Sequence, residues 1–346
     1  MSKKQANSNK DIMTQRDPWL DYLKAFAIYL VILGHIITNC MIGGSDSRFC
    51  GIIYFIHIPL FLVISGILVK DKPMNLVFWK GILSRFVLPY TVWTIILTTF
   101  FLGFKHLRND GFVVNILAYV HNWWYTFFWF IQTYLFVYIL WQALKTFDIW
   151  KRLGVGSLIL VFLNLLIRHE NWEAVTLLAS LALYTYTLFG AGACIKAYCH
   201  PVNKWHIMIA LLIFAMCLPF ATMSNSYFET TFNDMVETGR YHIFFIRLIA
   251  GVGISFALIY STHKITPPIQ FIQNIGQRTL QIYMLQSLLV EAVLPRIIHT
   301  PNTLWGYLLA AGIAVLMTCL CSLIIGYTTR MRLWGFLLWG TSKNEK

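Results

Sequence analysis

Long apolar segments separated by short polar breaks occupy most of this 346-residue chain. A helix needs about 20 apolar residues to cross the hydrocarbon core of a bilayer. The pattern therefore predicts an all-α integral membrane protein with about ten transmembrane helices. The predicted spans are residues 18–41, 50–69, 77–104, 125–144, 150–167, 173–198, 206–222, 241–261, 279–299 and 303–327.

The composition excludes an ordinary soluble protein. Charged residues make up 12% of the chain and hydrophobic residues 58%, whereas a soluble protein has roughly 25% charged residues. So few charged side chains would not cover the surfaces of two or three soluble domains. We therefore expect one membrane domain at 18–327, between an N-terminal tail at 1–17 and a C-terminal tail at 328–346.

Basic residues divide unequally between the two sides that these spans define. Of the 27 Lys and Arg residues, 19 lie in the two tails and the loops on their side, 7 lie on the opposite side and its adjoining helix ends, and Lys24 lies inside the first predicted helix. Because Lys and Arg are retained in the cytoplasm, both termini are predicted to be cytoplasmic. The same rule accounts for the net charge of +13 without a nucleic-acid partner.

The chain ends and the cysteines carry weaker signals. The polar first 17 residues and the long apolar run after them indicate a retained helix, and not a cleaved signal peptide. Residues 328–340 are typical of an interfacial helix or of a tail that lies on the membrane surface. Cys40 and Cys50 bracket the first predicted outer loop, where a disulfide is permitted, but the spacing alone does not show one. No CxxC or HExxH spacing occurs, so we expect no metal site.

The first predicted helix contains three ionisable residues, which are costly inside a membrane and are functional hypotheses by default. Lys24 and His35 are eleven residues apart, so they share one helix face and are separated by about 16 Å. Asp21 lies one turn before Lys24, and the two would form an ion pair at the interface. His35 suits general base catalysis near neutral pH, and Gly34 beside it would leave room for a substrate to approach the ring. A packing residue or a proton path remains an alternative for this histidine.

The second and third predicted helices add polar residues. His57 and Pro59 lie in an apolar run, and Ser65-Gly66 permits close helix contact. A cavity and simple packing explain these features equally well. Arg85 lies near the predicted cytoplasmic face, where together with Lys24 it would hold phosphates.

Several of these motifs, in order along the chain, resemble those of the acyltransferase-3 family of integral-membrane acyltransferases. That family has an Asp, then Arg or Lys, then ten residues and a His in its first helix. A His-Pro-Leu-Phe type run leading to Ser-Gly follows in the second helix. The matching residues are Asp21, Lys24, His35, His57-Ile58-Pro59-Leu60-Phe61, Ser65-Gly66, Arg85, Pro89-Tyr90, Trp129-Phe130, Gly276, Thr279-Leu280 and Ile282-Tyr283.

Three positions depart from the family pattern. Gln286 stands where many relatives have a histidine, so no catalytic role is assigned to it. Gln132 stands where some branches carry a carboxylate, which favours the short branch without a fused extracytoplasmic domain. Lys24 replaces the more common arginine, keeping the charge and losing the bidentate fork.

The resemblance implies acyl transfer, most often of acetyl, from cytoplasmic acyl-CoA to a hydroxyl of a cell-surface sugar, polysaccharide or lipid-linked precursor. Lys24 and Arg85 would hold phosphates of the acetyl-CoA co-substrate. His35 would act as base or carry the acyl group, and Asp21 and Ser65 would assist in catalysis. His57 would contact donor or acceptor. Such proteins are multi-pass proteins of the bacterial cytoplasmic membrane.

Two other functions suit the same residues. A transporter or flippase of a glycan precursor also uses intramembrane histidine and broken helices, although no pair of Gly/Pro-broken helices recurs in two halves of the chain. A non-catalytic partner in polysaccharide export is the second. The acceptor sugar, the acyl chain, the side of transfer and a homo-oligomeric state stay open at this stage.

Overall fold

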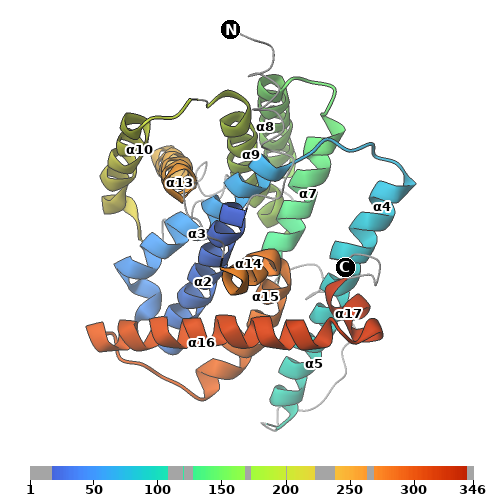
Figure 1. Cartoon of the computed structure of the whole chain (residues 1–346), viewed down its shortest axis with the longest axis vertical. Helices are drawn as coiled ribbons and strands as arrows, with labels where there is room; N and C mark the ends of the chain where they lie inside the picture. Colours follow the sequence, from blue (N-terminus) through green and yellow to red (C-terminus); the bar gives the residue numbers. More distant parts are fainter. Residues whose placement is uncertain are drawn as a thin grey trace.

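The computed structural model describes residues 18–107, 120, 128–167, 173–199, 201–222, 238–262 and 269–340, and these residues form an all-helical assembly (Figure 1). Within those ranges the only extended pairing is one isolated bridge between Met41 and Thr300. The predicted tail at 1–17 and residues 341–346 lie outside them. The α-helices are α2 (Pro18–Cys40), α3 (Arg48–Leu68), α4 (Leu76–Ile82), α5 (Leu88–Leu107), α7 (Trp129–Ala143), α8 (Ile149–Ile167), α9 (Glu173–Tyr198), α10 (Lys204–Cys217), α13 (Tyr241–Thr262), α14 (Gln270–Gln277), α15 (Thr279–Gln286), α16 (Leu304–Thr328) and α17 (Arg332–Trp339).

Seven helices in the described ranges are long and apolar enough to cross a membrane. They coincide with the predicted spans at 18–41, 50–69, 77–104, 150–167, 173–198, 241–261 and 303–327. Two further predicted spans contain shorter helices: α10 with a 3-10 turn at Leu218–Phe220, and the 15-residue α7. The total of ten spans and the cytoplasmic termini stay predictions.

The predicted span at 279–299 differs from one continuous α-helix. After α15 the chain forms a π-helix at Ser287–Val293 and then a 3-10 turn at Leu294–Arg296. Pro295 has no N–H to donate to the carbonyl four residues earlier, so a regular α-helix does not continue through this point. Glu291 lies within the π-helix, whose turns are wider than the α-helical ones that the sequence predicts.

A second π-helix, at Leu83–Val87, joins α4 to α5. Here the Leu88 N–H donates to the Leu83 carbonyl, five residues back. Pro89 lacks the N–H that would reach the Arg85 carbonyl, which favours this wider turn. π-bulges are frequent at functional sites, and Arg85 lies in this one.

The α3–α9 contact confirms the close packing expected at Ser65-Gly66. A Cβ atom at Gly66 would lie 1.9 Å from the Phe189 carbonyl oxygen, and one at Gly192 would lie 2.1 Å from the Val63 carbonyl oxygen. Only glycine permits so close an approach of the two backbones at both points. The helix that carries His57 is thereby fixed against α9.

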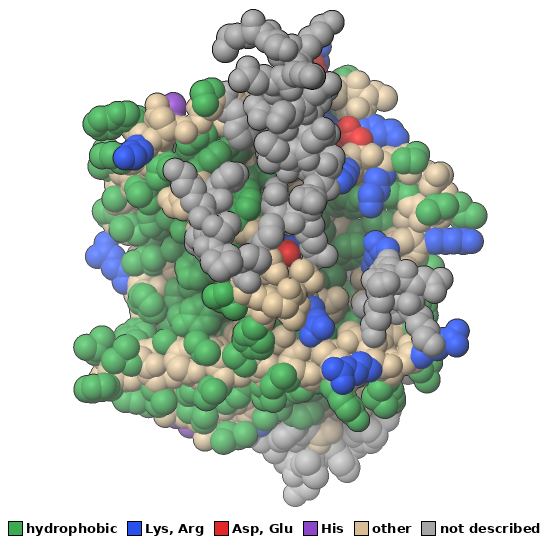
Figure 2. Space-filling model, viewed as in Figure 1, with side chains coloured by type: hydrophobic (Ala, Val, Ile, Leu, Met, Phe, Trp, Pro, Cys, Tyr) green, Lys and Arg blue, Asp and Glu red, His purple; other side chains and the backbone are tan. Residues whose placement is uncertain are grey.

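The C-terminal segment contains an eight-residue helix, α17, inside the predicted stretch 328–340. In α17 the buried Trp339 packs against Trp93 of α5 with ring centroids 5.3 Å apart, and the Trp93 indole N–H donates to the Leu338 carbonyl at 3.0 Å. Figure 2 shows hydrophobic side chains along α16, whose exposed residues include Leu308, Leu316 and Leu323. Such a face is typical of a helix in contact with lipid.

Cys40 and Cys50 are buried free thiols in the structure. The Cys50 sulfur lies 4.0 Å from the Gly34 carbonyl oxygen, on the α2–α3 contact. Both residues therefore pack as small apolar side chains and not as a disulfide.

Candidate active site

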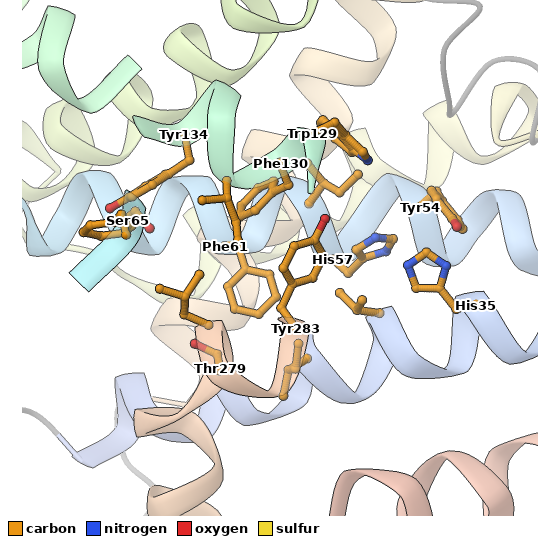
Figure 3. A pocket seen from close by; sticks show the side chains of 16 residues that line it. His35, Tyr54, His57, Phe61, Ser65, Trp129, Phe130, Tyr134, Thr279 and Tyr283 are labelled. Atoms are coloured by element: carbon orange, nitrogen blue, oxygen red, sulfur yellow. The ribbon is translucent and has the colours of Figure 1, made fainter. Parts of the chain in front are cut away.

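Two cavities bring the polar residues of α2 and α3 together with later parts of the chain. The smaller one, the histidine cavity, has a volume of about 230 Å³ and contains His35 of α2 and His57 of α3 among aromatic side chains (Figure 3). The larger one, the cation cavity, has a volume of about 1070 Å³. Five basic side chains line it: Lys24, Lys70, Lys72, Lys80 and Arg85.

The two cavities adjoin, because they share part of their walls. The shared residues are Ser65, Phe86, Tyr134, Thr279 and Leu280. Figure 3 shows Tyr134 of α7 pointing toward Ser65 of α3 at this junction. At this junction a strongly basic compartment adjoins an apolar one.

His35, which lines the histidine cavity, also faces the carboxylate of Glu291, which does not line it. Its Nε2 atom is 3.8 Å from Glu291 Oε1, with 19% and 31% of the two side chains exposed. Gln286 Nε2 and Ser287 Oγ donate to the same oxygen at 2.7 and 2.8 Å. The separation exceeds a hydrogen bond but permits a strong charge interaction when the imidazole is protonated.

Glu291 was not among the residues singled out from the sequence. It is an acidic residue inside a predicted membrane span, which is by itself a signal of function. Its alignment with His35 depends on the broken helix after α15, and no local sequence pattern gives that alignment.

His57 is buried and its ring is fixed. The Nδ1 atom lies 2.8 Å from the Ile53 carbonyl oxygen, and because a carbonyl only accepts, this nitrogen carries the proton. The Tyr54 ring packs against the imidazole edge with centroids 4.8 Å apart. Nε2 is then left as an acceptor, and Figure 3 shows the His57 ring between Tyr283 and His35.

Gly34 has a different role from the one that the sequence suggests. A small residue beside His35 would leave room for a substrate to approach the ring. A Cβ atom at Gly34 would instead lie 3.1 Å from Tyr54 Cε2. Tyr54 thus takes up the space, and the glycine serves the α2–α3 contact.

Lys24 and Asp21 form the expected ion pair, with Lys24 Nζ 2.5 Å from Asp21 Oδ1. Asp21 is buried and also accepts a hydrogen bond from Gln277 Nε2 at 3.2 Å. A Cβ atom at Gly276 would lie 1.9 Å from the Asp21 carbonyl oxygen, so glycine permits α14 to reach α2 here. Lys24 is held at the wall of the cation cavity.

The predicted site residues fall into two groups. Asp21, Lys24 and Arg85 lie at the cation cavity or beside it, and His35 and His57 lie in the histidine cavity. Asp21 is fourteen residues from His35 on α2, or about 21 Å along the axis. Ser65 is eight residues from His57 on α3, or about 12 Å. Asp21 is therefore not brought to the imidazoles, and Ser65 lies at the junction, away from His35 in Figure 3.

Comparison with known proteins assigns the chain to a family. The model described as "Acyltransferase domain", that of the acyltransferase-3 family, matches residues 17–327. The chain belongs to the acyltransferase-3 family. No solved structure matches it significantly.

Three named relatives each resemble only part of this acyltransferase-3 chain. Nodulation protein NolL of Mesorhizobium japonicum is 33% identical over 91 residues, 24% of each chain. NolL of Sinorhizobium fredii is 28% identical over 152 residues, 42% of this chain and 38% of the relative. O-acetyltransferase OatA of Staphylococcus aureus is 29% identical over 123 residues, 31% of this chain and 18% of the relative. The matches span well under half of each relative.

The positions where the chain departs from the acyltransferase-3 pattern have partners in the structure. Gln286 is buried and donates to Glu291 and to Ser287, at 2.7 and 3.2 Å. Gln132 of α7 is hydrogen bonded to the Tyr90 hydroxyl. The glutamine at 286 therefore supports the carboxylate that faces His35.

Proposed function

We propose that this protein is a membrane O-acyltransferase, and specifically an O-acetyltransferase. It would transfer the acyl group from cytoplasmic acyl-CoA to a hydroxyl of a cell-surface sugar, polysaccharide or lipid-linked precursor. The proposal includes ten transmembrane helices, cytoplasmic termini and a bacterial cytoplasmic membrane. Family membership and the resemblance to proteins named O-acetyltransferase support it. The observation that carries it is the pair of adjoining cavities, one basic and one containing two imidazoles.

The cation cavity suits the nucleotide end of CoA. Its five basic side chains match the several negative charges of the CoA phosphates. The pantetheine arm would then pass the junction at Ser65 and Tyr134. Lys24 and His35 are separated by about 16 Å along α2, and the flexible arm that joins the phosphates to the thioester would span this distance.

The histidine cavity suits the chemical step. The His35 imidazole takes the proton from the acceptor hydroxyl as its oxygen attacks the thioester carbonyl carbon. The carbon–sulfur bond breaks, and the leaving thiolate takes the proton from the imidazolium to give free CoA and the ester. An acyl-imidazole on His35, formed with release of CoA and then attacked by the hydroxyl, is the covalent variant of this route.

Glu291 and His57 would assist His35. The Glu291 carboxylate, 3.8 Å from the ring, stabilises the imidazolium that forms in the proton transfer. His57 presents its Nε2 acceptor to the same cavity and would accept a hydrogen bond from the donor amide or from the acceptor hydroxyl.

The test is transfer of label from radiolabelled acetyl-CoA, with the purified full chain in nanodiscs and a pool of host glycolipid and polysaccharide. The native chain should move label to a glycan. His35→Ala should abolish transfer, and Lys24→Ala should raise the donor KM and recover in part at high acetyl-CoA. His242→Ala changes an exposed histidine of α13 and is the matched control. Equal transfer by His35→Ala would refute the catalytic role of His35. If neither the native chain nor any variant binds acetyl-CoA, the proposal that acetyl-CoA is the acyl donor is refuted.

A further inference from the structure

The loop between α3 and α4 carries Lys70, Asp71 and Lys72, and its two lysines face the cation cavity while Asp71 does not line it. This alternation is what a chain without helical turns produces, since successive side chains point to opposite sides. The segment has no regular secondary structure, and the backbone at Val69 is extended. Something outside the loop must therefore hold the two lysines in place.

A buried glutamine of α7 holds the loop backbone. Gln142 is fully buried, its Oε1 accepts from the Lys72 N–H at 3.0 Å, and its Nε2 donates to the Lys70 carbonyl at 3.0 Å. One side-chain amide thus satisfies the two backbone groups on either side of Asp71. Tyr138, one turn before Gln142 on α7, lines the cation cavity.

A buried arginine of α8 holds Asp71, the residue between the two lysines. Arg152 Nη1 lies 2.8 Å from Asp71 Oδ1. The guanidinium is itself fixed, because its Nε donates to the Trp141 carbonyl at 2.6 Å and it stacks 4.5 Å from the centre of the Trp141 ring. Only 4% of the Arg152 side chain is exposed, against 58% for Asp71. Loss of Asp71 would leave this buried charge without its carboxylate.

We propose that Gln142 and Arg152 form a clamp on the 70–72 loop and act as positioning residues for phosphate binding by Lys70 and Lys72. The inference rests on the proposed function, because it takes the ligand of the cation cavity to be the phosphates of CoA. Flexible lysines lose rotamer freedom when they bind phosphate. The loop backbone would also lose freedom on binding, and fixing it in advance removes that part of the ordering cost.

Asp71 gives the sharpest test, because two explanations predict opposite signs. Simple electrostatics predicts that Asp71→Ala, which removes a negative charge beside two lysines, tightens phosphate binding. The clamp predicts weaker binding, since Arg152 no longer holds the loop. Asp71→Asn removes the charge but keeps an oxygen for Arg152, so it should bind at least as well as the native chain.

The experiment measures the Kd for CoA, and for pantetheine as the phosphate-free probe, by calorimetry on the full chain in nanodiscs. Gln142→Met keeps the side-chain volume and loses both backbone hydrogen bonds. We expect Gln142→Met and Asp71→Ala each to raise the Kd for CoA about tenfold, or about 1.4 kcal/mol, with pantetheine binding unchanged. The double change Lys70→Ala and Lys72→Ala is the positive control.

A destabilising substitution outside the 70–72 loop provides the matched control. Asn164 is a buried amide of α8 that donates to the Ala179 carbonyl and accepts from Ser180, far from the loop in sequence. Asn164→Ala should lower the thermal unfolding temperature and leave the Kd for CoA within twofold.

The outcomes separate the two proposals. If the native chain binds no CoA, the donor assignment and the clamp both fail. If the double variant Lys70→Ala, Lys72→Ala binds CoA weakly while Gln142→Met and Asp71→Ala bind it like the native chain, the clamp alone is overturned. Tighter CoA binding by Asp71→Ala, or equal losses for CoA and pantetheine, would also overturn it.

Discussion

The carboxylate of Glu291 offers the most informative single change at the candidate site. Glu291→Gln removes the charge that faces His35 but keeps a side-chain oxygen for the hydrogen bonds from Gln286 and Ser287. The local packing should therefore survive. The change isolates the electrostatic effect on the imidazolium that the proposed reaction forms.

The structure sets limits on the size of this effect. Two unit charges 3.8 Å apart attract by about 4 kcal/mol at an effective dielectric constant of 20, and by about 1 kcal/mol in bulk water. His35 and Glu291 are partly exposed, so the interaction lies between these limits. We expect a loss of about 2 kcal/mol of transition-state stabilisation, or a rate lower by about thirtyfold.

The assay is the initial rate of acetyl transfer at saturating acetyl-CoA, with the donor KM measured in parallel. Glu291 does not line the cation cavity, so the donor KM should not change. Glu291→Asp keeps the charge at a greater distance and should retain more activity than Glu291→Gln. A rate for Glu291→Gln within twofold of the native chain would refute the electrostatic role of this carboxylate.

Three other changes test different parts of the structure. Lys24→Arg keeps the charge, so the donor KM should stay within about threefold of the native value. Lys24→Ala should raise the donor KM about tenfold, which corresponds to a contribution of about 1.4 kcal/mol to phosphate binding. Equal KM values for both variants would contradict that role. Gly66→Ala should destabilise the fold by about 3 kcal/mol or more, because the added Cβ would lie 1.9 Å from the Phe189 carbonyl oxygen, and an unchanged unfolding temperature would argue against the α3–α9 contact. Cys40 and Cys50 are free thiols, so alkylation in denaturant without reductant should modify both, and mass spectrometry showing both unmodified would contradict this.

The sequence by itself determined much of the helical framework. A transmembrane helix satisfies its own backbone hydrogen bonds and needs only length and apolarity, both of which are local properties. For this reason the spans at 18–41 and 241–261 are found within two residues of their predicted ends. The regular rise of a helix likewise fixed the spacing of Lys24 and His35 before any tertiary contact was known.

Features that depend on two distant segments were decided by the tertiary structure alone. The interruption after α15 sets Glu291 opposite His35, and helix periodicity carries no information about that pairing. Gly34 was expected to leave space beside the histidine, yet Tyr54 of another helix takes that space. Neither outcome follows from the residues nearest in sequence.

The cation cavity likewise depends partly on the sequence and partly on the tertiary structure. Four of its basic residues (Lys70, Lys72, Lys80 and Arg85) were visible in the sequence as part of a cytoplasmic charge excess, which orientation in the membrane already explains. The fifth, Lys24, was visible as a charge inside the first predicted helix. Only the folded chain gathers all five around one cavity and joins it to the histidines. The physical reason is that charge and apolarity are properties of single residues, whereas a binding site is made by side chains from several helices meeting at defined distances.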